Sequence, residues 1–301
     1  MTGLFARNDG PIASLEPVER FLYWCGERHK IHERRAAGLP KPWTTDPILR
    51  RYYFTNVYRE LDKTTAWFRR TVRDPLRATP AVVFATVCFR WFNLIETGEI
   101  LSAYGFLTQW DEVAVIATLS ERRANGFPIF TGAFMVNSPA GRPKLEAICE
   151  RISNVWHDLE RLVASASCWK TMRDAHKDLL RYPGLGGFMA YELVCDLRHT
   201  VWLEHATDIM TWSNPGPGAV RGLYRVLGRE ISNKSNATSP PVPPEWADET
   251  LRLRALLEAS YPSMPTFEAR EVEQSLCEFD KYDRLLFGDG RSKRVYDGWS
   301  G

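Results

Sequence analysis

No apolar run in this sequence approaches the roughly 18 residues that a membrane-spanning helix needs. The N-terminus lacks a basic segment followed by an apolar core, so no secretion signal is expected. The six cysteines are scattered and form no Cys-x-x-Cys pair, and the six histidines show no His-Glu-x-x-His spacing. A structural metal site and a disulfide framework are therefore not expected, and neither is a cofactor. We expect a cytoplasmic protein that does not engage a membrane.

A large excess of charge is also missing, because 39 Lys and Arg oppose 37 Asp and Glu for a net charge of +2. This balance excludes a strongly basic carrier of bulk nucleic acid but permits a local basic groove. Lysine is scarce, at nine of the 39 positions, so arginine supplies most cations. Its planar fork suits phosphates and base edges, although an arginine-rich codon bias explains the same composition.

Apolar residues recur at helical spacing along nearly the whole chain, without βαβ alternation or an internal repeat. The sequence therefore predicts a mainly α fold. Its length suits a single helical domain over 1–301, or two helical lobes within it, with a proline-rich surface loop at 233–244. Residues 128–136 are predicted as a short strand or an extended loop. Helices are predicted over 17–37, 47–68, 80–97, 110–125, 143–165, 168–180, 245–260 and 268–282.

A glycine-rich turn follows the helix predicted to end at Leu180, and a further helix follows the turn. Gly184, Leu185, Gly186 and Gly187 would expose backbone N–H groups at the start of that helix, which suits a phosphate. One interpretation is a helix-hairpin-helix that holds a DNA backbone without reading its sequence. The other is a plain corner in a helical bundle.

The region after this turn resembles the helix-hairpin-helix DNA glycosylases, which place a catalytic aspartate just beyond the second hairpin helix. Asp208 lies at the corresponding place, 24 residues after Gly184. Phe188 stands where the bifunctional glycosylases carry a lysine nucleophile, which argues against a Schiff-base lyase. Asp208 is thus the favoured working carboxylate, and a helix-capping role is its alternative.

In the N-terminal third, a continuous helix would bring Asn56, Arg59, Glu60 and Lys63 to one face. An asparagine, an arginine and a carboxylate together suit a uracil-like edge and a phosphate. Asp62 lies beside this face. The alternative is a solvated lattice of salt bridges, which is the commoner arrangement on a helix.

Two further blocks lie in the C-terminal third. A Pro-Gly-Pro-Gly loop at 215–218 precedes Arg221, which is placed for an anion, and no P-loop pattern occurs anywhere in the sequence. Cys277 and Lys281 are one helical turn apart, so Lys281 could lower the pKa of the thiol and make it a nucleophile. A small core residue is the alternative for Cys277.

Taken in order, the blocks at 27–49, 54–62, 183–191, 215–223 and 276–282 resemble one family. This is the helical domain associated with 5-hydroxymethyluracil DNA kinases, which stands alone in the α-glutamyl/putrescinyl-thymine pyrophosphorylases of bacteriophages. The resemblance implies a glycosylase-like helical fold used in thymine hypermodification inside an infected bacterium. Since the sequence lacks the kinase's P-loop domain, the implied reaction replaces the phosphate rather than adding it.

The resemblance implies double-stranded DNA carrying phosphorylated 5-hydroxymethyluracil as one substrate. The second is a free amino acid, such as glycine or glutamate, or a polyamine such as putrescine. The target base would be flipped into a pocket. The candidate acid–base residues are Asp208, Glu60 and Asp62, with Cys277 or Cys195 for a thiolate route. The candidate substrate-binding residues are Trp43 and Tyr58 for stacking, together with Asn56, Arg59, Arg198, Arg221 and Lys281.

Two other classes of function remain open. A true glycosylase would excise a modified thymine, with Asp208 stabilising the sugar cation. A non-catalytic helical module would bind DNA and assist a separate 5-hydroxymethyluracil DNA kinase.

Overall fold

The computed structural model describes residues 12–132, 141–231, 240–289 and 295. These residues are mainly helical, as predicted, and the only strand-like pairing among them is an isolated bridge between Tyr52 and Val295. None of the helices they form is long and apolar enough to cross a bilayer. The chain divides into two compact units. Unit 1 comprises Met1–Arg59 and Met210–Gly301, and unit 2 comprises Glu60–Ile209.

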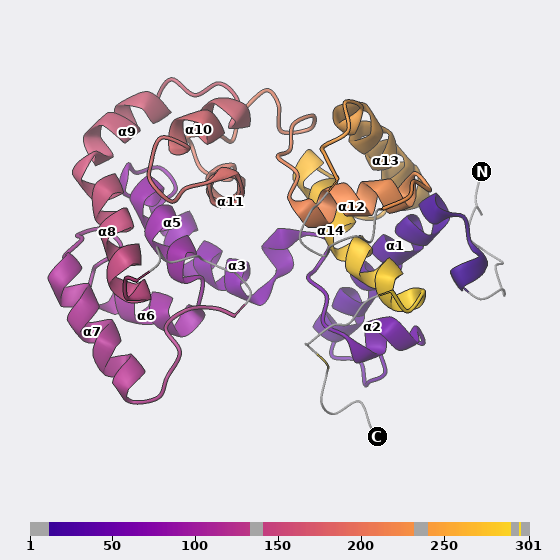
Figure 1. The fold of residues 1–301 in the computed structure, drawn as a ribbon, viewed down its shortest axis with the longest axis horizontal. Coiled ribbons are helices and arrows are strands. Elements are labelled where there is room, and N and C mark those ends of the chain that lie inside the picture. The colour runs from indigo at the N-terminus through magenta and orange to yellow at the C-terminus, as the bar shows by residue number, and fades with distance from the viewer. Residues whose placement is uncertain (1–11, 133–140, 232–239, 290–294, 296–301) are drawn as a thin grey trace. The chain divides into compact units, whose positions relative to one another are not determined.

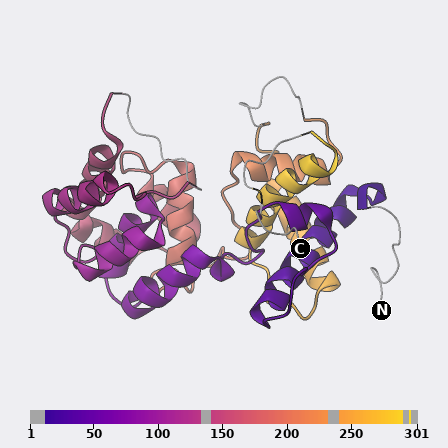
Figure 2. The same cartoon turned by 90° about the horizontal axis from the view of Figure 1, so that it is seen from below.

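Unit 1 is built from both ends of the chain. Its helices are η1 (Ile12–Ser14), α1 (Pro17–Ala36), α2 (Pro47–Arg51), α12 (Pro217–Val226), α13 (Trp246–Ser260) and α14 (Ala269–Leu286). Helix α1 packs against α12, α13 and α14, so N-terminal and C-terminal segments share one core (Figures 1 and 2). Phe21 of α1 meets Phe279 of α14 edge to face at 5.5 Å between ring centroids.

Helices α12 and α14 approach each other closely because α12 carries two glycines one turn apart. A Cβ atom at Gly222 would lie 2.0 Å from the carbonyl oxygen of Leu276, and one at Gly218 would lie 2.5 Å from Cys277 Sγ. A side chain at Gly222 would displace the backbone of α14, and one at Gly218 would displace the Cys277 side chain. The glycines of this block therefore have a packing role.

The Thr-Asp-Pro sequence before α2 also has a structural role. The Asp46 carboxylate accepts the N–H groups of Ile48 and Leu49 and so caps the helix. It also accepts the hydroxyl of Tyr282 at 2.7 Å and that of Tyr23 at 3.3 Å. The cap thus links α1, α2 and α14 inside unit 1.

Unit 2 is arranged around α5 (Ala81–Phe92), which is buried along almost its whole length. Helix α5 packs against α6, α8, α11 and η3. It ends because Asn93 adopts a left-handed conformation with φ 47°. The remaining elements are η2 (Arg59–Leu61), α3 (Lys63–Phe68), the π-turn η3 (Arg69–Arg73), α4 (Asp74–Leu76), α6 (Ile95–Ala103), α7 (Glu112–Ala124), α8 (Lys144–His157), α9 (Leu159–Ala166), α10 (Met172–Leu179) and α11 (Gly187–Leu197).

The continuous helix predicted over 47–68 is wrong. Helix α2 ends at Arg51, Tyr52 turns to an extended conformation, and α3 begins only at Lys63. Between them Phe54, Val57 and Tyr58 are buried, so burial of large side chains in a non-helical segment overrides local helical preference. The shared helical face expected for Asn56, Arg59, Glu60 and Lys63 does not exist.

The helix predicted over 80–97 is divided, because α5 ends at Phe92 and α6 begins at Ile95. The other predicted helices are present with shifted ends or a break. The helix expected over 143–165 is interrupted at Asp158, and the one expected from 168 begins at Met172 after a capping box formed by Thr171 and Asp174. The described part of the predicted 128–136 strand or loop, 128–132, is non-helical and forms no strand. Residues 240–244 of the proline-rich segment also form no helix or strand, while 133–136 and 233–239 lie outside the described residues.

A buried ion pair joins α5 to α11. Arg90 donates to both carboxylate oxygens of Asp196, at 2.5 and 2.7 Å, and the two side chains are 2% and 0% exposed. The same guanidinium donates to Asn93 and Thr65 and lies 5.3 Å from the Phe68 ring centroid. Each nitrogen of the Arg90 guanidinium and each oxygen of the Asp196 carboxylate therefore has a hydrogen-bond partner. Buried charges are tolerated under this condition.

Replacing Arg90 by glutamine should lower the free energy of unfolding by about 3–5 kcal/mol, because the Asp196 charge would remain buried without its partner. The matched control is Arg77→Gln, which breaks a surface pair with Glu204 whose side chains are 48% and 28% exposed. That change should cost less than about 1 kcal/mol. Denaturant unfolding measures both, and equal decreases would contradict a special role for the buried pair.

Candidate functional site

Helices α10 and α11 of unit 2 are a pair of packed helices joined by a glycine-rich turn at residues 180–186, and this pair is called the α10–α11 hairpin. Gly184 has φ +86°, and a Cβ there would lie 2.7 Å from the Arg151 side chain, so this position needs glycine for both conformation and space. Leu185 is buried beneath the turn, whereas a Cβ at Gly186 would meet nothing within 4 Å. The backbone at Gly186 and Gly187 begins α11.

A polar network fixes the entry to this hairpin. The Tyr182 hydroxyl donates to Asp158 at 2.8 Å, and Arg161 donates to Asp158, Asp178 and the Tyr182 oxygen. Trp169 donates to the other oxygen of Asp178. The hydrogen bond from Arg161 lowers the pKa of Asp158. Tyr182, at the start of the turn, is therefore hydrogen-bonded to Asp158 and Arg161 at the start of α9, and Arg161 is also hydrogen-bonded to Asp178 of α10.

His176 of α10 connects the two hairpin helices. Its Nε2 lies 3.0 Å from the Gly187 carbonyl oxygen, and since a carbonyl only accepts, Nε2–H is the donor. Burial of the ring lowers the pKa of His176 below its ordinary value of 6.5. The neutral imidazole is therefore the form that holds the start of α11.

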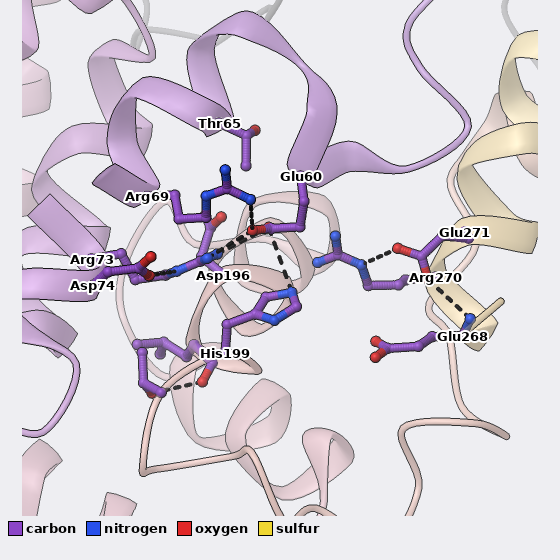
Figure 3. Close-up of polar contacts among 12 residues, drawn as sticks. Glu60, Thr65, Arg69, Arg73, Asp74, Asp196, His199, Glu268, Arg270 and Glu271 are labelled. Atoms are coloured by element: carbon purple, nitrogen blue, oxygen red, sulfur yellow. Dashed lines mark hydrogen bonds and ion pairs between the residues drawn. The ribbon is translucent and has the colours of Figure 1, made fainter. Parts of the chain in front are cut away.

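A cluster of charged side chains surrounds Glu60 at the other end of α11 (Figure 3). Arg73, which is buried, donates to both Glu60 oxygens at 2.9 and 2.7 Å. Arg69 lies 3.9 Å from one of these oxygens, and His199 Nε2 lies 3.5 Å from the other. His199 follows Asp196 by three residues at the C-terminal end of α11, where its N–H donates to the Asp196 carbonyl. The buried core pair and the Glu60 cluster are therefore neighbours along one helix.

Asp208 lies in the turns after α11, and its carboxylate caps a different helix. One oxygen accepts the Met172 N–H at 2.7 Å and the other accepts the Arg173 N–H at 3.1 Å, in the first turn of α10. The capping alternative raised from the sequence thus describes contacts that are present. Each carboxylate oxygen retains further acceptor capacity.

The two aromatic residues expected to stack on a base lie in different surroundings in unit 1. Tyr58 is 7% exposed, its hydroxyl donates to the Pro265 carbonyl at 2.5 Å, and its ring packs against Phe267. The expectation that Tyr58 stacks on an extruded base is therefore wrong. Trp43 is half-buried beside two cations, with Lys41 5.4 Å and Arg35 5.9 Å from its ring centroid.

Cys277 does not have the surroundings of a reactive thiolate. The residue reaches the surface, but its sulfur lies against Gly218, and desolvation together with Glu273 and nearby carboxylates raises the pKa of the thiol. Lys281 instead donates to the Tyr53 carbonyl, and its Nζ lies 4.3 Å from the centroid of the Phe54 ring. The expectation that Lys281 lowers the pKa of Cys277 is therefore wrong. Cys195, the second thiol considered, is buried within α11.

The other residues predicted for the site lie partly in unit 1 and partly in unit 2. Arg221 of α12 donates to the buried Asp280 carboxylate at 3.0 Å and keeps part of its side chain exposed. Within unit 1, Asn56 accepts a hydrogen bond from Gln274 through its carbonyl, and Arg59 is buried. Within unit 2, Asp62 precedes α3 and Arg198 follows the last residue of α11.

Sequence reasoning found Glu60 but missed its partners Arg73 and His199. It also missed the Arg90–Asp196 pair, for which a signal exists: Arg90 is the single charged residue between 80 and 95, inside the most apolar segment. A charge in such a segment predicts a buried counter-charge. Among the parts of the chain that the structure describes, no group of three or more His, Cys, Asp and Glu residues is arranged to hold a metal.

The chain belongs to the family described as the 5-hmdU DNA kinase helical domain, whose model matches residues 16–292. It is 27% identical over 295 residues to the 5-hmdU DNA kinase of Bacillus phage SP10. This alignment covers 90% of the chain and 45% of the relative, so the chain spans about half the length of the curated relative it matches. No solved structure matches it significantly. The family expected from the sequence motifs is confirmed at the level of the helical domain.

The free energy of unfolding should fall as the pH drops below about 6.5, in part because of His176. The unfolded chain takes up a proton near its ordinary pKa of 6.5, whereas the buried ring resists protonation until a lower pH. Each tenfold weakening of proton binding in the folded state corresponds to about 1.4 kcal/mol of stability that disappears across this window. Denaturant unfolding between pH 7.5 and 5 measures the slope.

His176→Gln should reduce that slope, since glutamine can donate to the Gly187 carbonyl without titrating. His157→Gln, at an exposed position at the end of α8, is the matched control for the loss of a histidine. A His176→Gln variant with an unchanged slope would show that another group carries the pH dependence.

Proposed function

We propose that this chain replaces the phosphate or pyrophosphate of phosphorylated 5-hydroxymethyluracil in DNA by an amine, as an α-glutamyl/putrescinyl-thymine pyrophosphorylase does. The observation that carries the proposal is the family match over residues 16–292. These 301 residues contain no P-loop pattern, so phosphorylation through such a loop is not assigned to them. The amine nitrogen attacks the exocyclic methylene carbon, a C–N bond forms, and the C–O bond breaks as the phosphate leaves with its electron pair.

Two features of unit 2 support DNA as a substrate. The α10–α11 hairpin has a fixed glycine turn, and a DNA phosphate would approach it at the start of α11. Arg151 packs against Gly184 and brings a positive charge to the turn. Contacts of this kind hold the backbone without reading bases, as a modification of many thymines requires.

The transfer also needs a group that removes a proton from the incoming ammonium and cations that stabilise the leaving phosphate. Asp208 and the Glu60 cluster are the two candidates for the first task. Arg59, Arg198 and Arg221 remain candidates for the second, and Trp43 remains the candidate for stacking. Tyr58, Cys277 and Lys281 have no part in this assignment.

Gly186→Gln should weaken binding of duplex DNA roughly ten-fold, or about 1.4 kcal/mol, by obstructing the hairpin. The open space at this position leaves folding intact, unlike a change at Gly184, where Arg151 would be displaced. The slope of log affinity against log salt should fall by about 0.9 for each phosphate that the variant no longer binds. Ala124→Gln, at an exposed position at the end of α7, is the control and should bind normally. Equal affinities would argue against the hairpin as the place where DNA binds.

The function itself is tested by nucleoside mass spectrometry. Duplex DNA carrying phosphorylated 5-hydroxymethyluracil is incubated with the protein and with glycine, glutamate or putrescine, and phosphate release is measured in parallel. The expected product is a deoxyuridine whose 5-methylene carbon is bonded to the nitrogen of the amine, in equal amount to the released phosphate or pyrophosphate. Abasic sites would instead indicate a glycosylase. DNA binding without a product for any amine would indicate a non-catalytic module.

Asp208→Asn should lower this transfer by roughly 10²-fold if Asp208 is the general base. Its amide has one acceptor oxygen for two N–H donors, so a decrease in stability of about 1 kcal/mol from weaker capping should accompany the change. Asp174→Asn is a matched control, since Asp174 also accepts N–H groups at the start of α10. If both variants reduce transfer equally, Asp208 acts through the stability of α10 rather than through proton transfer.

A further inference from the structure

His199 and Glu60 form a pair whose geometry differs from that of the buried pair beside it. The His199 side chain is 26% exposed, whereas Arg90 and its partner Asp196 are almost inaccessible. Glu60 is held in place because Arg73 donates to both of its oxygens. In Figure 3 the His199 ring points toward the Glu60 oxygen that lies 3.5 Å from Nε2. A fixed carboxylate thus faces a partly exposed imidazole.

The distribution of charge gives the two residues different tasks. Arg73 and Arg69 already neutralise Glu60, so its carboxylate gains little from a proton of its own. It can instead orient His199 and stabilise a protonated imidazole, in the way that a buried aspartate supports histidine in a catalytic triad. The C-terminal end of α11, where His199 lies, also favours a cation. The charged group that faces the ring is Glu60, and Arg69 and Arg73 are the cations bound to that carboxylate.

We infer that His199 is the catalytic base that deprotonates the incoming amine, and that Glu60 is a positioning residue that acts through His199. This rests on the amine transfer proposed above. In this role the neutral imidazole carries its proton on Nε2, the nitrogen 3.5 Å from Glu60, and Nδ1 is the accepting nitrogen. The ammonium gives one proton to His199, the freed nitrogen pair forms the C–N bond, and the phosphate leaves with the C–O electron pair. The imidazolium then returns its proton to water.

His199→Gln should lower kcat/KM for transfer by roughly 10²-fold and remove the fall in rate on the acidic side of the pH profile. Glu60→Gln should give a similar decrease in rate, and the double variant should be no slower than the worse single one because the pair acts as a unit. His205→Gln, with a side chain 92% exposed, is the matched control and should keep the normal rate and profile. Thermal melts of all variants show whether each is folded.

A second measurement does not depend on activity. The imidazole signals of His199 are titrated by NMR in the unsubstituted protein and in Glu60→Gln, and the pKa of His199 should fall when the carboxylate charge is removed. An unchanged titration, or a His199→Gln rate within about three-fold of normal in folded protein, would overturn the inference. If the unsubstituted protein transfers no amine, the proposed function fails together with the base role. The titration would still decide whether Glu60 controls His199.

Discussion

The ion pair between Arg90 and Asp196 is the interaction on which the arrangement of unit 2 depends. It fixes α11 against α5, and α11 carries the hairpin at its start and His199 just beyond its end. Any shift of α11 along α5 would separate two charges that have no access to water, at a cost of several kcal/mol. Both elements of the candidate site are therefore held by one buried interaction between helices.

Arginines of unit 1 also form ion pairs that join two helices. The Asp280 carboxylate, which is buried, accepts from Arg221 at 3.0 Å and from Arg225 at 2.9 Å, and Asp283 accepts from Arg20. The planar guanidinium carries five N–H donors, so one arginine can bind two separate acceptors. Arg225 binds Asp280 and Asp283, and Arg20 binds Asp283 and the Leu15 carbonyl. In these pairs the use of arginine rather than lysine therefore reflects ion pairs between helices inside the protein. It is not by itself a signature of nucleic-acid binding.

Most helices could be predicted because their apolar spacing, proline starts and glycine ends are local signals, as for α5 and α13. The segment from Tyr52 to Asp62 could not, because its conformation is decided by burial of Phe54 and Tyr58 against residues more than 200 positions away. The turn between α10 and α11 could also be predicted, because its glycines are a local signal, as the proline before α5 is. The contact between Glu60 and His199 could not, since it joins positions 139 residues apart that only the tertiary fold brings together.

The lengths of the hairpin helices constrain how DNA would meet the site. Helix α11 runs for 11 residues from Gly187 to Leu197, which at 1.5 Å per residue separates the hairpin turn from the vicinity of His199 by about 16 Å. At 3.4 Å per base step, a duplex that lay along α11 would advance roughly five steps over this distance. On the proposed function, a base reacting near His199 would then lie several nucleotides from a phosphate held at the hairpin. The hairpin would hold the backbone of flanking duplex while the reacting nucleotide left the stack. Contacts at the hairpin would contribute mainly to affinity, and changes at His199 mainly to turnover.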